Sequence, residues 1–193
     1  MRIIGGTAKG HTIKAPKGVD TRPTLDRVRE SVFNVLSNRG IFGTHVLDIF
    51  SGTGAVAIEA LSRGAAHAVA VDFKTGKLIL ENAKHCHVED RLEIIPRKLS
   101  QLKNYIMGQQ FDYIFSDPPY ENGFIQETID MVVDCDLLKP EGVLLLEHHK
   151  DEAFTLPESW KCIKEQKFGY TMVSYFVNTA ERSKTCAYRC VSG

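Results

Sequence analysis

Short apolar segments alternate with segments of helical periodicity through most of this chain, and this alternation constrains its fold most strongly. Strands and helices that alternate in this way favour a parallel sheet with helices on both faces. Strands are expected at 46–50, 68–72, 92–95, 111–116 and 142–147, and helices at 55–63, 75–85, 99–107 and 125–133. Two further strand-like segments, 160–168 and 171–177, predict a terminal hairpin. The expected fold class is therefore α/β, a doubly wound and mostly parallel sheet with one antiparallel strand.

The first 39 residues have a different pattern and carry an excess of positive charge. Strand-like pieces at 2–4 and 12–14, with glycines between them, predict a β-hairpin extension. A helix is expected after Thr24, a candidate N-cap, up to Gly40. Eight Lys or Arg residues against three Asp or Glu residues leave an excess of five positive charges, although the whole chain is neutral. We expect a basic extension at 1–39, a main domain at 40–180 and a tail at 181–193.

The charge distribution and the cysteines narrow the class of protein. A basic arm on an acidic body favours a polyanionic partner such as nucleic acid, with a solvated basic face as the alternative. Five irregularly spaced cysteines indicate free thiols, and they do not have the spacing of a zinc site, so no metal is expected. The N-terminus has no apolar signal core, and no run reaches membrane-spanning length. A cytoplasmic protein without a membrane partner is expected.

A glycine-rich turn follows the strand at 46–50. The segment 52–57, Gly-Thr-Gly-Ala-Val-Ala, fits the pattern G-x-G-x-x-[GA], and Asp72 ends the next strand. Glycines let a ligand approach the backbone, and an acid at that place can hold ribose hydroxyls. Alone, this pattern is typical of a dinucleotide dehydrogenase. Asp48 argues against one, because its carboxylate would repel a pyrophosphate and attract a sulfonium or ammonium group.

A stiff corner, Asp117-Pro118-Pro119-Tyr120, follows the strand at 111–116. Each proline fixes its own φ, lacks an N–H and keeps the preceding residue out of the helical region. The corner offers a carboxylate, carbonyls and a ring, the groups that hold a planar ring carrying an NH2 group. Both motifs end parallel strands near the expected switch point, where ligands bind in such sheets. A cationic, ribose-bearing cofactor beside an amine-holding corner suggests S-adenosylmethionine and N-methylation.

These motifs carry a family resemblance. The segments LDIFSGTG at 47–54 and DPPY at 117–120 resemble the S-adenosylmethionine-dependent amino-methyltransferases of the class I fold. RIIGG at 2–6, RPT at 22–24, DRVRESVFN at 26–34 and EALSRGA at 59–65 are similar to the bacterial 16S rRNA guanine-N2 methyltransferases, the small-subunit rRNA methyltransferase D type. The resemblance runs from Met1 to about Val177. Lys98 departs from it, because such enzymes often have Asp or Asn there to accept a hydrogen bond from the adenine amine.

The resemblance implies a seven-stranded Rossmann-like sheet, S-adenosylmethionine as methyl donor, and a guanine N2 in 16S rRNA as acceptor. The RNA is expected in an assembled or partly assembled 30S subunit, and a monomer is expected, although the sequence does not set the oligomeric state. Other readings stay open: an adenine-N6 methyltransferase on DNA or RNA, a dehydrogenase, and a non-catalytic RNA-binding module.

The expected site residues form three groups. Asp117 and the Pro118 carbonyl would accept the amine hydrogens and Tyr120 would stack on the base, so the expected catalytic residues are Asp117, Pro118, Pro119 and Tyr120. The expected cofactor-binding residues are Asp48, Ser51, Gly52, Gly54, Asp72, Phe73, Thr24 and Asp117. The expected RNA-phosphate contacts are Arg2, Lys9, Lys14 and Arg22, although Arg22 and Thr24 could instead line the cofactor pocket.

Overall fold

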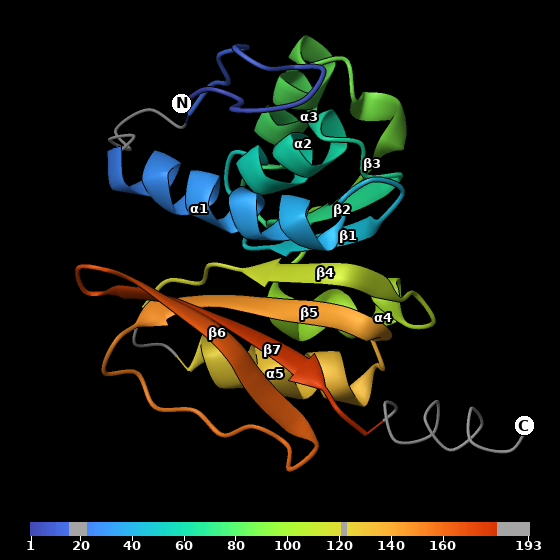
Figure 1. Ribbon diagram of the computed structural model, residues 1–193. Helices are drawn as coiled ribbons and strands as arrows, with labels where there is room; N and C mark the ends of the chain where they lie inside the picture. Colours follow the sequence, from blue (N-terminus) through green and yellow to red (C-terminus); the bar gives the residue numbers. More distant parts are fainter. Residues whose placement is uncertain (16–22, 121–122, 181–193) are drawn as a thin grey trace, which may run out of the picture.

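The computed structural model describes residues 1–15, 23–120 and 123–180. Its centre is a seven-stranded sheet with the strand order β3-β2-β1-β4-β5-β7-β6 (Figure 1). The strands are β1 (His45–Ile49), β2 (His67–Val71), β3 (Leu92–Ile95), β4 (Phe111–Ser116), β5 (Leu138–His149), β6 (Trp160–Phe168) and β7 (Thr171–Asn178). The helices are α1 (Pro23–Arg39), α2 (Ala55–Ser62), α3 (Gly76–His85), α4 (Leu99–Ile106) and α5 (Phe124–Asp134), with a 3-10 turn at Glu89–Arg91. In this part of the chain β7 alone runs antiparallel to its neighbours, which confirms the predicted fold class.

Helices cover both faces of the sheet, and each face has its own apolar core. Helices α1, α2 and α3 lie on one face, and α4 and α5 lie on the other (Figure 1). Successive side chains of a strand point to opposite faces. In β4, Tyr113 and Phe115 therefore join the core under α1–α3, and Ile114 joins the core over α4 and α5.

The chain reverses its direction across the sheet between β1 and β4. It leaves β1 for β2 and β3, and it returns to β4 on the other side of β1. Ile49 pairs with Ser116, so the turn after β1 and the corner after β4 are neighbours at one edge. Ser116 also pairs with Leu146, so Glu147 of β5 lies level with Asp117. Ligands bind at such a switch point because the flanking loops diverge there.

The N-terminal arm forms a short antiparallel hairpin, as predicted. Arg2 bridges Thr12, and Ile3 and Ile13 donate their amide hydrogens to the carbonyls of His11 and Met1 at 3.0 and 3.1 Å. Beyond Ile3, side chains of the main domain bind the arm's backbone in place of regular pairing. Glu59, fully buried on α2, accepts the amide hydrogens of Ile4 and Gly5, each at 2.7 Å. The arm's apolar residues enter the core under α1–α3: Ile3, Ala8 and Ile13.

The predicted N-cap at Thr24 is wrong. Helix α1 begins at Pro23, so Thr24 lies inside the first turn. Proline is favoured at the first helical position because it has no N–H to leave unpaired. The side chain of Thr24, the whole of Arg22 and the tail at 181–193 lie outside the described residues. The division at residue 39 between extension and main domain stays a prediction.

Within the described residues, none of the helices has the length and apolar character needed to cross a membrane. No group of three or more His, Cys, Asp or Glu side chains within 1–15, 23–120 and 123–180 is arranged to hold a metal ion.

Candidate active site

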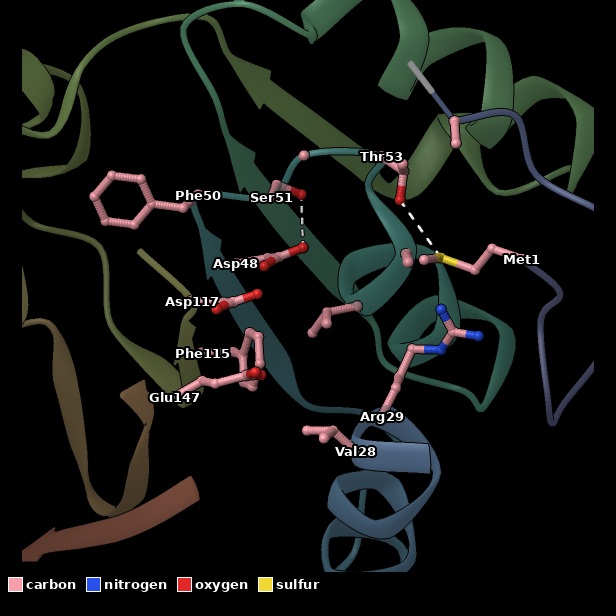
Figure 2. Close-up of a pocket in the computed structure, with 14 residues that line it drawn as sticks. Met1, Val28, Arg29, Asp48, Phe50, Ser51, Thr53, Phe115, Asp117 and Glu147 are labelled. Atoms are coloured by element: carbon pink, nitrogen blue, oxygen red, sulfur yellow. Dashed lines mark hydrogen bonds between the residues drawn. The ribbon is translucent and has the colours of Figure 1, made fainter. Parts of the chain in front are cut away.

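A cavity of about 190 Å³ lies at the carboxyl edge of β1, β4 and β5, beneath α1 and the N-terminal arm (Figure 2). The close-up shows Asp48, Asp117 and Glu147 on the sheet side and Arg29, Val28 and Met1 on the opposite side. The full lining is Met1, Ala15, Val28, Arg29, Asp48, Phe50, Ser51, Gly52, Thr53, Ala55, Val56, Phe115, Asp117 and Glu147. The fold therefore brings the two sequence motifs to one cavity.

The turn after β1 is held by its own hydrogen bonds. Asp48 Oδ2 accepts the Ser51 hydroxyl at 2.6 Å and the Ala57 amide at 3.1 Å. Asp48 is almost fully buried, and this burial raises its pKa to about 7. The cavity is therefore lined by a carboxyl group that an arriving cation would help to ionise.

The two glycines of this turn serve different needs. Gly54 has φ 80°, and a Cβ there would lie 2.9 Å from the Ile79 side chain of α3. Gly52 has φ 56° and faces open space, since a Cβ would meet nothing nearer than 3.9 Å. Gly54 thus allows helix packing, whereas Gly52 leaves room for a ligand next to the backbone.

Asp72 comes into contact with Gly52, although twenty residues separate them. Asp72 Oδ2 accepts the Gly52 amide at 3.2 Å, and Oδ1 accepts the amides of Lys74 and Thr75 at 2.8 and 3.0 Å. Asp72 therefore joins the turn after β1 to the start of α3. It is not among the residues that line the 190 Å³ cavity.

Phe73 follows Asp72 and presents a half-exposed ring. The ammonium groups of Lys74 and Lys98 lie 4.9 and 5.6 Å from its centroid. Phe73 does not line the cavity either. The structure thus pairs Lys98, the departure from the family pattern, with one of the expected cofactor residues.

The corner after β4 presents its carboxylate differently. No hydrogen-bond donor within the described ranges reaches the side chain of Asp117. Burial raises its pKa to about 6. Pro118 is buried and Pro119 exposed, and the hydroxyl of Tyr120 is 2.8 Å from Thr171 Oγ1 on β7. The corner is therefore fixed through Tyr120, while Asp117 is left to face the cavity.

Glu147 also lines the cavity, although no sequence motif pointed to it. It ends the apolar run of β5, lies level with Asp117 and is almost fully buried. Its pKa is raised to about 8, first by burial and then by the charge of Asp117. In the described part of the chain its carboxylate accepts no hydrogen bond. The rule that singled out Asp48, Asp72 and Asp117, an acid at the carboxyl end of a parallel strand, also applies to Glu147 and could have found it.

Arg29 was also missed. It lies on α1, is 5% exposed, and its Nη2 donates to the Arg2 carbonyl and to Asp26 Oδ1. Its Nε has no hydrogen-bond partner, and the nearest carboxylate oxygen, of Glu59, is 4.0 Å away. Helical periodicity gives no signal for Arg29, because a charged residue next to Val28 is expected on a solvent-facing side of the helix.

The expected RNA contacts lie apart from the cavity. Arg2 and Lys9 are exposed and line a separate hollow with Arg27 on α1. Lys14 Nζ binds Glu81 Oε2 at 3.0 Å. From this arm, Met1 and Ala15 reach the cavity instead.

Comparisons with known proteins give the family. The family model described as Conserved hypothetical protein 95 matches residues 1–177. The ribosomal RNA small subunit methyltransferase D of Escherichia coli is 30% identical over 184 residues, which cover 94% of this chain and 91% of that protein. The chain belongs to this family. The predicted resemblance is thereby confirmed.

A second relative and a solved structure agree with this assignment. The ribosomal RNA small subunit methyltransferase D of Haemophilus influenzae is 32% identical over 179 residues, which cover 91% of each chain. A solved structure from Escherichia coli, described as a candidate methyltransferase named yhhF, is 29% identical with a TM-score of 0.82. The match covers 93% of this chain and 98% of the chain in that structure. The methyltransferase fold thus extends over nearly the whole chain.

Proposed function

We propose that this protein is a cytoplasmic enzyme that methylates the exocyclic N2 of a guanine in 16S rRNA, with S-adenosylmethionine as donor. The rRNA methyltransferase D family supports methylation of ribosomal RNA, and an assembled or partly assembled 30S subunit is the proposed substrate. One observation supports the guanine assignment above the others. Two carboxyl groups without protein partners in the described part of the chain, Asp117 and Glu147, open onto the same cavity.

The charges of the cavity fit the cofactor. S-adenosylmethionine carries a sulfonium, an ammonium and a carboxylate, and it supplies an electrophilic methyl group when bound. Asp48 on the sheet side would face the cationic groups, and the guanidinium of Arg29, which lines the opposite side from α1, would attract the carboxylate. Asp72 and Phe73 would hold the ribose and the adenine beyond the Gly52 turn.

In the reaction, the chain's own residues hold and orient the acceptor. Asp117 and the Pro118 carbonyl would accept the two hydrogens of the amine, which turns the nitrogen lone pair toward the methyl group. Bound S-adenosylmethionine would supply its methyl group to this nitrogen, and its sulfur would keep the electron pair of the broken S–C bond. The nitrogen then loses a proton, which Asp117 can take to solvent. Asp117 acts mainly by position, and positioning can supply several kcal/mol.

Glu147 supports guanine over adenine. Guanine presents a ring N1–H next to its N2 amine, so two neighbouring carboxylates can accept from the same edge. Adenine has an acceptor, N1, beside its N6 amine. An ionised Glu147 would repel adenine N1, whereas the protonated form could donate to it, so with a pKa of about 8 the preference for guanine should grow as pH rises. The same corner without a second acid would suit either base.

Mass-spectrometric mapping tests the assignment. Small-subunit particles that lack the modification are incubated with the protein and S-adenosylmethionine, and naked 16S rRNA and duplex DNA are treated in parallel. We expect one N2-methylguanine in the particle. Methyl groups found on adenine N6 would show that adenine, and not guanine, is the acceptor. If no nucleic acid is methylated, the protein is not a nucleic-acid methyltransferase. Equilibrium binding of S-adenosylmethionine and of NAD, measured side by side, excludes or restores the dehydrogenase.

A further inference from the structure

Three aromatic rings continue the cavity edge onto the surface. The strands that bring Asp117 and Glu147 to the cavity bring Tyr120 and His149 to the surface a few residues later. The His149 ring lies 6.0 Å from that of Tyr120 and 5.9 Å from that of Tyr170, and it is nearly parallel to the latter, at 10°. We call His149 and Tyr170 the hairpin platform, because Tyr170 forms the turn between β6 and β7.

The platform is fixed in place and open to solvent. Lys150 donates its amide hydrogen to the Tyr170 carbonyl at 2.9 Å, which ties the turn to the end of β5. Tyr120 and Thr171 join the turn to the catalytic corner at 2.8 Å. Tyr170 is nevertheless 71% exposed. A large ring held this firmly on a turn, yet largely uncovered, is a ready contact surface.

The charge around the platform indicates what it contacts. Asp151 Oδ2 lies 3.6 Å from Lys150 Nζ and 3.8 Å from His149 Nδ1. The cation beside the rings therefore has an acidic neighbour, which makes the patch a poor phosphate site. Flat rings in a nearly neutral patch suit the faces of nucleobases, which stack on aromatic side chains with little dependence on sequence.

The proposed reaction would make use of such a surface. A base whose amine enters a closed cavity must leave its stack, and its neighbours in the RNA then lose a stacking partner. A ring pair directly beside the cavity can replace that partner.

We propose that the hairpin platform of His149 and Tyr170 is a stacking site for an unpaired nucleobase adjacent to the target nucleotide. This inference rests on the proposed methyl transfer to RNA. It adds a second contact surface, distinct from the basic N-terminal arm, that holds base faces and not phosphates.

Variants of Tyr170 test it. Tyr170→Ala removes the ring, Tyr170→Trp keeps one, and Tyr105→Ala is the matched control. Tyr105 is also a half-exposed tyrosine with a cation over its ring, since the guanidinium of Arg97 lies 5.1 Å from the ring centroid. It suits as a control because it lies near the C-terminus of α4, at the edge of the sheet where β4 begins and not where β4 ends. For unmodified small-subunit particles, Tyr170→Ala should raise KM about 10-fold, as expected for one lost stacking contact, with kcat and S-adenosylmethionine affinity unchanged. Tyr170→Trp should restore KM, and Tyr105→Ala should leave it as in the wild type.

A second measurement does not depend on methyl transfer. The fluorescence of a single-stranded oligoribonucleotide that contains the base 2-aminopurine should be quenched when the wild type binds, and much less when Tyr170→Ala binds. The slope of log affinity against log salt should not change, because no phosphate contact is lost. Ring-dependent quenching without methylation of any RNA would keep the platform as a base-stacking site and reject the proposed function, and with it the placement beside a target nucleotide.

Other outcomes overturn the inference. If Tyr170→Ala methylates particles with the wild-type KM, the platform does not contact the substrate, while the proposed function stands. If its KM rises for particles, and neither quenching nor the KM for naked RNA changes, Tyr170 contacts a ribosomal protein. An equal rise in KM for Tyr105→Ala would show a general surface effect.

Discussion

The turn after β1 and the corner after β4 are neighbours in the sheet, yet they treat their carboxyl groups in opposite ways. Asp48 and Asp72 together accept five hydrogen bonds from nearby backbone and hydroxyl groups. Asp117 and Glu147 accept none from the described residues, although Glu147 is almost fully buried. On one side of the cavity the acids hold the protein's own chain, and on the other they do not.

This difference separates a preformed region from one that awaits a partner. Hydrogen-bonded acids fix the shape of the Gly52 turn before any ligand arrives. Buried acids without partners are costly, and natural proteins keep such groups mainly where a ligand will satisfy them. The β1 side therefore suits the cofactor, and the β4–β5 side suits the donor groups of the methyl acceptor.

Removing the first unpaired acid is the most severe test of this contrast. Asp117→Ala should reduce methyl transfer on the order of 10³-fold, the middle of the range for a positioned acid or base. The affinity for S-adenosylmethionine, measured by calorimetry, should be nearly unchanged. Asp130→Ala, at an exposed position on α5, is the control and should act as the wild type. Normal turnover of the Asp117 variant would end its assignment.

Replacing the second unpaired acid should raise stability and lower activity together. Glu147→Leu removes a buried carboxyl group, so the free energy of unfolding should rise by about 1 kcal/mol or more. Methyl transfer should fall about 10- to 100-fold, because a buried donor of the base is left unpaired at about 1–3 kcal/mol. Glu147→Gln keeps an acceptor oxygen and should retain most activity. Full activity of the leucine variant would contradict a role in guanine recognition.

On the hydrogen-bonded side, a single change should affect folding and cofactor binding at once. Asp72→Ala removes the acceptor of three amides, so unfolding in urea should require about 2 kcal/mol less. S-adenosylmethionine should also bind about 10-fold more weakly, since a ribose hydrogen bond is worth about 1–2 kcal/mol in the same terms. Calorimetry on the folded variant separates the two effects. An affinity equal to that of the wild type would remove Asp72 from the ribose site.

The acids around the cavity predict that two quantities change in opposite directions as pH rises: the stability of the ligand-free protein and its affinity for S-adenosylmethionine. Burial raises the pKa of Asp48, Asp117 and Glu147 to about 7, 6 and 8. The folded protein thus holds more protons than the unfolded chain, whose acids titrate near pH 4, so the free energy of unfolding without ligand should fall as pH rises toward 8. A bound cation favours the ionised acids and releases protons, so affinity for S-adenosylmethionine should rise from pH 6 to 8.

Two measurements check this linkage. Urea unfolding between pH 5 and 8.5 follows the ligand-free stability. Calorimetric titration at pH 7 in buffers of different ionisation enthalpy counts the protons released on binding. Proton uptake on binding would contradict the assignment of a cationic ligand to this cavity.

The smallest expected effect is on the N-terminal arm. If Lys9 contacts one phosphate, Lys9→Ala should lower the salt slope of log affinity for RNA by about 0.7–0.9. Lys14→Ala should change it less, because Lys14 already pairs with Glu81. Lys103→Ala on α4 is the control, and an unchanged slope for Lys9→Ala would remove Lys9 from the interface.

Much of this arrangement could be predicted because its signals are local. The strands at 92–95 and 111–116 begin and end as expected, since short apolar runs closed by proline or a polar residue are read without tertiary information. The spacing predicted that Gly52 and Asp72 serve one ligand site, and the structure brings them together, with the Gly52 amide 3.2 Å from Asp72 Oδ2. Topology places the ends of neighbouring parallel strands together whatever the side chains are.

The arm and helix α1 could not be predicted in the same way. The predicted hairpin is present, but its pairing stops after Ile3, because Glu59, more than fifty residues away, binds the amides of Ile4 and Gly5. Arg29 is buried because the arm folds over it, and its Nη2 donates to the Arg2 carbonyl. No pattern within either segment carries that information.

The sequence by itself determined the order of the elements, the place of the cavity at the β1–β4 switch point, and two of the three acids that line it, Asp48 and Asp117. Those features follow from periodicity, proline chemistry and the topology of parallel sheets. Only the tertiary structure decided which acids have partners, that Glu147 and Arg29 join them, and that the hairpin platform lies beside them. The physical reason is that burial and hydrogen bonding depend on contacts between segments far apart in the chain.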